Sequence, residues 1–227
     1  MIKLAIFDLD DTLYDEVDYC RSGLSSVAQL LAESTEGATA EDVFGVLWGQ
    51  FNAGDRTKIF NDALDKLGID YTADFIMSLV KHYREHKPDI ILPDDSRTVL
   101  EQLQGKYTLA LLTDGFLPAQ KLKARALGIE KYFKCIIYTE ELGREFWKPN
   151  PAGFKKILAQ LQTQADSSVY IGDNEKKDFI APNELGFKTI KLIRPRGIHT
   201  EVSTEQGASA GYVIHNISEL PGLLAKL

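Results

Sequence analysis

The sequence has few cysteines and no long hydrophobic segment. Its 227 residues include only Cys20 and Cys135, which lie far apart and in no metal-binding spacing. Two such thiols are typical of a reduced, cytoplasmic protein, and the alternative is a disulfide between them. Because no run of about 18 apolar residues is present, we expect no segment that spans a membrane.

The sequence also lacks an excess of positive charge. Asp and Glu number 33 against 26 Lys and Arg, so the formal net charge is -7. This balance argues against a nucleic-acid polymer or an anionic membrane as a partner, but not against a small phosphate ester bound at a local cation site. The apolar start of the chain is short and ends in acidic residues without a cleavage site, so we predict a cytoplasmic location.

Short apolar runs, most of them followed by a helical pattern, indicate strands that are buried on both faces. These runs are residues 3–9, 107–113, 135–139, 168–172, 188–193 and 211–214, and the last precedes an expected helix over 218–227. Strands that alternate with helices imply right-handed crossovers in a parallel sheet. The sequence therefore predicts a doubly wound α/β core formed by residues 1–14 and 91–227.

Residues 15–90 interrupt this alternation. They contain no convincing strand, but apolar residues recur at helical spacing in several stretches, such as Val43, Leu47 and Phe51 on one face. We predict a four-helix domain inserted after the first strand.

Residues capable of phosphate or metal chemistry follow several of the expected strands. Asp8 and Asp10 follow the first, Thr113 and Asp114 end the second, and Asp173 follows the run 168–172. The carboxyl ends of neighbouring strands in a doubly wound sheet meet in one crevice, so we expect these side chains to converge. Carboxylates brought together repel unless a cation lies between them, and an all-oxygen set favours Mg²⁺.

Asp8 and Asp10 can divide the work of a reaction between them. One carboxylate of such a pair stays ionised and attacks, while the other holds a proton and acts as a general acid–base. The alternative is an ordinary capped turn, since Asp and Thr are common in turns.

Four motifs in order resemble those of the haloacid dehalogenase superfamily in its phosphatase form. The first is Phe-Asp-Leu-Asp-Asp-Thr-Leu at residues 7–13, and the second is Thr-Asp-Gly at 113–115. The third is Lys-Pro at 148–149, and the fourth is Gly-Asp-Asn at 172–174, continuing to Asp178. The inserted helices at 15–90 match the helical cap of that family. Asp114 departs from the pattern, because many members carry Asn there, and we expect its side chain to turn away.

This resemblance implies a Mg²⁺-dependent phosphatase that works through an aspartyl-phosphate intermediate. Asp8 would be the nucleophile, Asp10 the general acid–base and Lys148 a catalytic cation. Thr113, the Asp114 amide and Lys148 would bind the phosphoryl group. The implied substrate is a small phosphorylated metabolite, either a sugar phosphate or a nucleotide monophosphate.

The resemblance also implies the ligands of the metal. Mg²⁺ would be held by Asp8, the main-chain carbonyl of Asp10, and Asp173. Asp178 would either be a further ligand, through water, or orient Lys148.

Three other functions fit part of the same pattern. A 2-haloacid dehalogenase of the superfamily lacks the second acid, so Asp10 argues against it. A phosphomutase usually has Asp-Gly-Val where this chain has Asp10-Asp11-Thr12. A phospho-accepting regulatory domain shares the aspartate, threonine and lysine, but not the helical insertion. No residue pattern indicates an oligomeric state.

Overall fold

The computed structural model describes residues 1–34, 37–199 and 202–227. The chain forms two compact units, one made of Met1–Val17 and Ile91–Leu227 and the other of Asp18–Ile90. None of the helices in the described ranges is long and apolar enough to cross a membrane.

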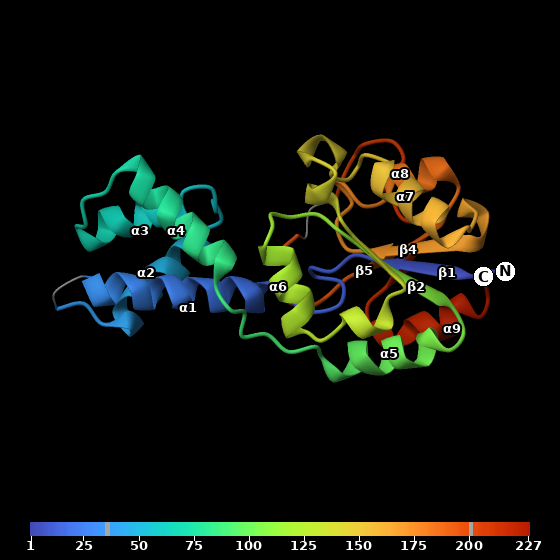
Figure 1. Ribbon diagram of the computed structural model, residues 1–227, viewed down its shortest axis with the longest axis horizontal. Helices are drawn as coiled ribbons and strands as arrows, with labels where there is room; N and C mark the ends of the chain where they lie inside the picture. The colour runs from blue at the N-terminus through green and yellow to red at the C-terminus, as the bar shows by residue number, and fades with distance from the viewer. Residues whose placement is uncertain (35–36, 200–201) are drawn as a thin grey trace. The chain divides into compact units, whose positions relative to one another are not determined.

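The first unit is built on a six-stranded parallel sheet with the strand order β3-β2-β1-β4-β5-β6 (Figure 1). Its strands are β1 (Leu4–Phe7), β2 (Thr108–Thr113), β3 (Cys135–Tyr138), β4 (Ser168–Gly172), β5 (Lys188–Leu192) and β6 (Tyr212–Ile214). All four residues of β1 are buried, as expected of a central strand covered on both faces. The doubly wound α/β fold predicted from the apolar runs is confirmed.

Helices cover both faces of this sheet (Figure 1). On one face lie α5 (Asp94–Gln104) and α9 (Leu220–Leu224), and on the other α7 (Ala152–Leu161) and α8 (Ile180–Leu185), while α6 (Ala119–Ala126) follows β2. Short 3-10 helices fill several connections, at Glu130–Tyr132, Thr139–Glu141, Arg144–Phe146, Ala165–Ser167 and Ile217–Glu219.

The C-terminal helix is shorter than the sequence predicted. The expected helix over 218–227 is a 3-10 turn followed by the five residues of α9. Asn216 starts the turn with a capping box, in which its side chain and that of Glu219 satisfy each other's backbone N–H groups. Pro221 then stands in the first turn of α9, where its missing N–H leaves no hydrogen bond unmade.

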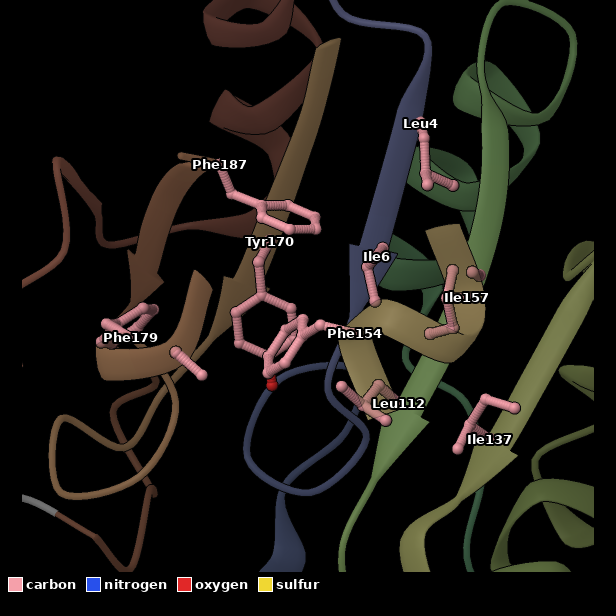
Figure 2. Packing of buried hydrophobic residues seen from close by; sticks show 11 residues of the cluster. Leu4, Ile6, Leu112, Ile137, Phe154, Ile157, Tyr170, Phe179 and Phe187 are labelled. Atoms are coloured by element: carbon pink, nitrogen blue, oxygen red, sulfur yellow. The ribbon is translucent and has the colours of Figure 1, made fainter. Parts of the chain in front are cut away.

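A hydrophobic cluster holds α7 and α8 against the sheet (Figure 2). The rings of Phe154 and Tyr170 pack edge to face with centroids 4.9 Å apart, and Phe187 lies 5.7 Å from Phe154. Figure 2 shows the Tyr170 hydroxyl pointing out of this cluster toward the carboxyl ends of the strands. The core therefore places a polar atom at the edge of the sheet where the chemical groups gather.

The second unit is helical in its described residues. It contains most of α1 (Glu16–Ser34), together with α2 (Ala40–Asn52), α3 (Ile59–Leu67) and α4 (Ala73–Glu85). Thr39 and Thr72 cap the first turns of α2 and α4 by accepting backbone N–H groups. Gly68 ends α3 in the left-handed conformation that glycine adopts without strain.

Candidate active site

Most of the predicted residues meet where the central strands end. Asp8 follows β1, Thr113 is the last residue of β2, and Asp173 follows β4. The Asp8 N–H donates to the carbonyl of Ile171 at 2.8 Å, which continues the pairing of β1 with β4 by one residue. Because β1 lies between β2 and β4, Asp8 stands at the centre of this edge.

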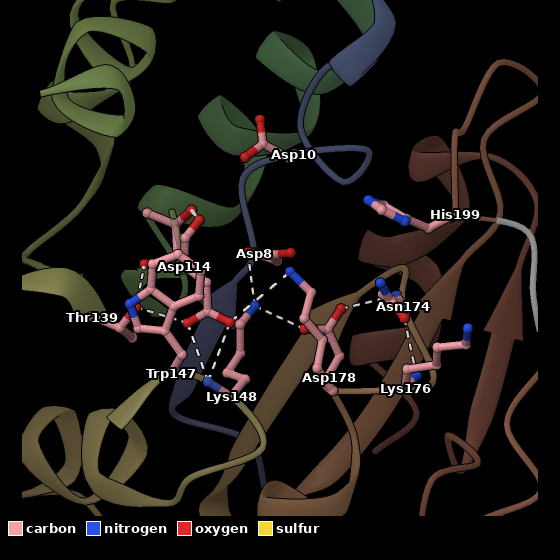
Figure 3. Close-up of polar contacts among 12 residues, drawn as sticks. Asp8, Asp10, Asp114, Thr139, Trp147, Lys148, Asn174, Lys176, Asp178 and His199 are labelled. Carbon is pink, nitrogen blue, oxygen red and sulfur yellow. Dashed lines mark hydrogen bonds and ion pairs between the residues drawn. The ribbon is translucent and has the colours of Figure 1, made fainter. Parts of the chain in front are cut away.

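Lys148 joins the groups at this edge (Figure 3). Its Nζ lies 2.9 Å from Asp8 Oδ1 and 2.7 Å from Asp178 Oδ1, and it donates to the Tyr170 hydroxyl at 2.9 Å. Burial lowers the pKa of this ammonium, but the carboxylates of Asp178 and Asp8 outweigh it and hold the pKa well above its ordinary value. Lys148 is therefore a fixed cation beside Asp8.

Asp178 uses both of its carboxylate oxygens in hydrogen bonds. Oδ1 accepts from Lys148 and, at 3.1 Å, from the Tyr170 hydroxyl. Oδ2 accepts the backbone N–H groups of Asp173 and Asn174 at 3.1 and 2.9 Å. Burial raises the pKa of Asp178, but Lys148 and these bonds outweigh it, and the pKa lies below its ordinary value. These contacts favour the orienting role of the two roles predicted for Asp178.

Asp173 carries an oxygen atom that no described residue satisfies. Its Oδ2 is buried and has no hydrogen-bond partner among the described residues. Ligand oxygens of Asp8, Asp173 and Asp178 lie within 4.8 Å of one another, and burial together with the other two carboxylates raises the Asp173 pKa well above its ordinary value. An unsatisfied buried carboxylate among other carboxylates is the oxygen donor set that a hard cation such as Mg²⁺ takes. The residues present therefore fit the implied metal.

Burial and the neighbouring lysine act on the pKa of Asp8 in opposite directions. Burial raises the pKa of its carboxyl to about 6, against the lowering effect of Lys148. A bound cation would lower the Asp8 pKa, as Lys148 does, because a positive charge favours the ionised form.

Asp10 lies apart from the group around Lys148 (Figure 3). Its Oδ1 accepts from Lys123 Nζ at 2.8 Å and from the Tyr14 hydroxyl at 2.5 Å, and its Oδ2 accepts from Gln120 Nε2 at 2.8 Å. Burial raises the pKa of Asp10, but Lys123 and the three hydrogen bonds outweigh it, and the pKa lies below its ordinary value. The structure therefore places the two motif carboxylates in different polar surroundings.

The carboxylate of the second motif is hydrogen-bonded within the protein. Asp114 Oδ1 accepts from the Thr139 hydroxyl at 2.8 Å, and both oxygens accept from the Lys148 N–H at 3.2 Å. The Thr113 hydroxyl accepts from Gln120 Nε2 at 2.6 Å. The Asp114 carboxylate thus makes its hydrogen bonds with Thr139 and with the backbone of Lys148.

A loop after β5 braces the first motif. The Asp11 carboxylate accepts the backbone N–H groups of Glu16 and Ile198 at 2.8 and 2.7 Å, and Asp11 has a left-handed φ of 51°. Burial raises the pKa of Asp11 to about 6. Arg194 donates two hydrogen bonds to the Thr12 carbonyl at 3.1 Å. The turn that carries Asp10 is therefore fixed from two sides.

Sequence reasoning missed four of the polar residues near this edge. Tyr170 looks like a core residue of a buried strand, and its hydroxyl gives no pattern. Gln120 and Lys123 lie three residues apart in a short helix, which places them on one face but does not say what they face. Lys177 adjoins the fourth motif, and its Nζ lies 4.0 Å from Asp114 Oδ2.

Comparison with known proteins agrees with this geometry. The family model described as haloacid dehalogenase-like hydrolase matches residues 5–192. A glyceraldehyde 3-phosphate phosphatase of Methanocaldococcus jannaschii is 26% identical, with 100% of this chain and 99% of that protein covered. The N-acylneuraminate-9-phosphatase of Mus musculus is 26% identical, with 100% of this chain and 95% of that protein covered. In the crystal structure of a 2-haloacid dehalogenase from Pseudomonas syringae, the chain is 25% identical to this one and superposes with a TM-score of 0.67. The match covers 100% of this chain and 99% of that chain.

Proposed function

Because this chain belongs to the haloacid dehalogenase-like hydrolase family, we propose that it is a Mg²⁺-dependent phosphatase acting on a small phosphomonoester. The observation that carries the proposal is the group at the strand ends. A buried carboxylate, Asp8, lies 2.9 Å from the buried ammonium of Lys148. A ligand oxygen of Asp8 also lies within 4.8 Å of one from Asp173, whose Oδ2 has no hydrogen-bond partner among the described residues. A nucleophile, a cation and a metal-ligand set are the parts that phosphoryl transfer to a carboxylate requires.

The metal would be held by Asp8, the Asp10 main-chain carbonyl and Asp173, with Asp178 as a ligand through water at most. When bound, Mg²⁺ supplies positive charge that offsets the repulsion between a phosphate dianion and a carboxylate. Lys148 would neutralise charge on the same phosphoryl group. Thr113 and the Asp114 amide would hold its remaining oxygens.

The reaction would then proceed in two steps. Asp8 forms a bond to phosphorus while the bond from phosphorus to the ester oxygen breaks, and Asp10 gives its proton to the leaving alcohol. Water next attacks phosphorus, Asp10 takes a proton from that water, and the Asp8–phosphate bond breaks to release inorganic phosphate. Asp10 thereby returns to its starting state.

We place the substrate among phosphorylated carbohydrates rather than nucleotides. The two curated relatives cited above are named for glyceraldehyde 3-phosphate and for N-acylneuraminate 9-phosphate, which are small phosphorylated carbohydrate compounds. We further propose that residues 15–90 act as the helical cap of a core formed by 1–14 and 91–227. The acidic balance and the two separated cysteines support the proposed cytoplasmic location.

The test is release of inorganic phosphate from a panel of sugar phosphates, nucleoside monophosphates and p-nitrophenyl phosphate. Each is assayed with Mg²⁺ and with EDTA, using wild type, Asp8→Asn and the control Asp166→Asn, which makes the same change at an exposed position of the core. We expect release that needs Mg²⁺, persists in the control and vanishes in Asp8→Asn.

The panel also includes 2-chloropropionate, because the dehalogenase likeness suggests that alternative. Chloride release without phosphate release would replace the proposal by a dehalogenase. If the folded protein releases neither, the phosphatase assignment is wrong.

A further inference from the structure

The Asp10 carboxylate is surrounded by donors that no motif contains. Lys123 and Tyr14 donate to one of its oxygens and Gln120 to the other, at 2.5–2.8 Å. A carboxylate offers about four lone-pair positions. Among the described contacts three are filled, so one remains for a reacting group.

Gln120 connects Asp10 to Thr113 at the end of β2. Its Nε2 donates both to Asp10 Oδ2 at 2.8 Å and to the Thr113 hydroxyl at 2.6 Å. Its side chain passes so close to Gly115 that a Cβ there would lie 2.7 Å from Gln120 Cδ. The glycine of the second motif therefore leaves the space through which Gln120 reaches both partners.

Lys123 is buried although it carries a charge. It is 4% exposed, and its Nζ lies 2.8 Å from Asp10 Oδ1 and 3.8 Å from Glu16 Oε1. Burying an ammonium is costly unless anions compensate it. The buried ammonium of Lys123 therefore depends on its contact with the Asp10 carboxylate in this orientation. One turn of α6 brings Gln120 and Lys123 to the same side.

We propose that Gln120 and Lys123 are positioning residues for the acid–base step. They hold the Asp10 carboxylate in one orientation and link it to Thr113, so that its remaining lone pair faces the attacking water. This inference rests on the proposed phosphatase function. It concerns mainly the second step, in which water attacks the phosphorus of the aspartyl phosphate, its proton passes to Asp10, and Asp8 is released.

The variants are Lys123→Met and Gln120→Leu, which keep the approximate size of the side chain and remove the donors. Lys121→Met is the control, because Lys121 lies on the same helix but is half-exposed and pairs with Glu141. p-Nitrophenyl phosphate is the probe, since its leaving group departs without a proton. Rapid-quench measurements give the fraction of enzyme held as aspartyl phosphate, and thermal melts report folding.

We expect kcat to fall at least about tenfold in both variants, while the fraction held as aspartyl phosphate rises above that of wild type. Lys121→Met should match wild type in both readouts. A loss of kcat without a rise in the trapped fraction would show a merely structural role and overturn the inference. Wild-type rates in both variants would also overturn the inference. If Lys123→Met fails to fold, the result for Gln120→Leu alone tests the inference. Failure of the proposed function is distinguishable, because wild type itself would then form no phosphoenzyme.

Discussion

Replacing Tyr170 by Phe removes one polar atom, the hydroxyl oxygen, from the candidate active site. The hydroxyl lies 2.9 Å from Lys148 Nζ and 3.1 Å from Asp178 Oδ1, so the substitution removes two hydrogen bonds to charged groups. The ring packs against Phe154 at 4.9 Å and against Phe179 at 6.3 Å, and these contacts are unchanged by the loss of the oxygen. The variant therefore tests the polar contacts without opening a cavity.

The expected loss follows from the charge of the partners. A hydrogen bond to a charged group contributes about 1.5–3 kcal/mol. Two hydrogen bonds are removed, but Lys148 Nζ and Asp178 Oδ1 stay paired with each other at 2.7 Å, which offsets part of the loss. We therefore expect the free energy of unfolding to fall by the value of one such bond, about 1.5–3 kcal/mol. For a chain of this size that lowers Tm by roughly 3–12 °C. We also expect a lower kcat, because Lys148 loses one of the groups that fix it beside Asp8.

Urea unfolding and steady-state phosphate release measure the two effects. The control is Tyr212→Phe on the edge strand β6, where the side chain is exposed and the change should stay within about 0.5 kcal/mol. If Tyr170→Phe proves as stable and as active as this control, the hydroxyl does not hold Lys148, and our account of the lysine is wrong.

Three other perturbations have defined outcomes. Gly115→Ala should destabilise the fold by about 1–3 kcal/mol, because φ is +140° and the new Cβ would meet Gln120. The control is Gly222→Ala, where a Cβ has open space. Equal urea midpoints for the two variants would refute the predicted destabilisation. The Asp11 pKa of about 6 lies above its ordinary 3.8, so the folded state binds the extra proton and stability falls as pH rises between these values, by up to about 3 kcal/mol. Urea titrations in EDTA should therefore show Asp11→Asn gaining on wild type from pH 4 to 7, and parallel curves would contradict it. Mg²⁺ at 100 times its Kd should stabilise wild type by about 2.7 kcal/mol but not Asp173→Asn, and an equal Tm rise in both would place the metal elsewhere.

The fold class and the kind of chemistry could be predicted from the sequence alone. Short apolar runs such as residues 4–7 and 168–172, most of them followed by helical patterns, indicate a sheet covered on both faces. Polar residues that follow such runs are then expected at one edge of the sheet. Local patterns were less reliable for the ends of elements. The first strand stops at Phe7 rather than at residue 9, because the chain turns at Leu9, whose carbonyl accepts the backbone N–H groups of Thr12 and Leu13.

The contacts among the side chains at that edge could not be predicted from the sequence and depend on how the chain folds. The hydrogen bonds of Asp178 Oδ1 come from Lys148, which is 30 residues away, and from the hydroxyl of Tyr170, whose ring belongs to the core. The surroundings of Asp10 depend on the rotation of α6, which brings Lys123 across 113 residues of sequence. Such contacts leave no periodic or local signal, because they arise from the packing of separate elements rather than from the conformation of any one of them.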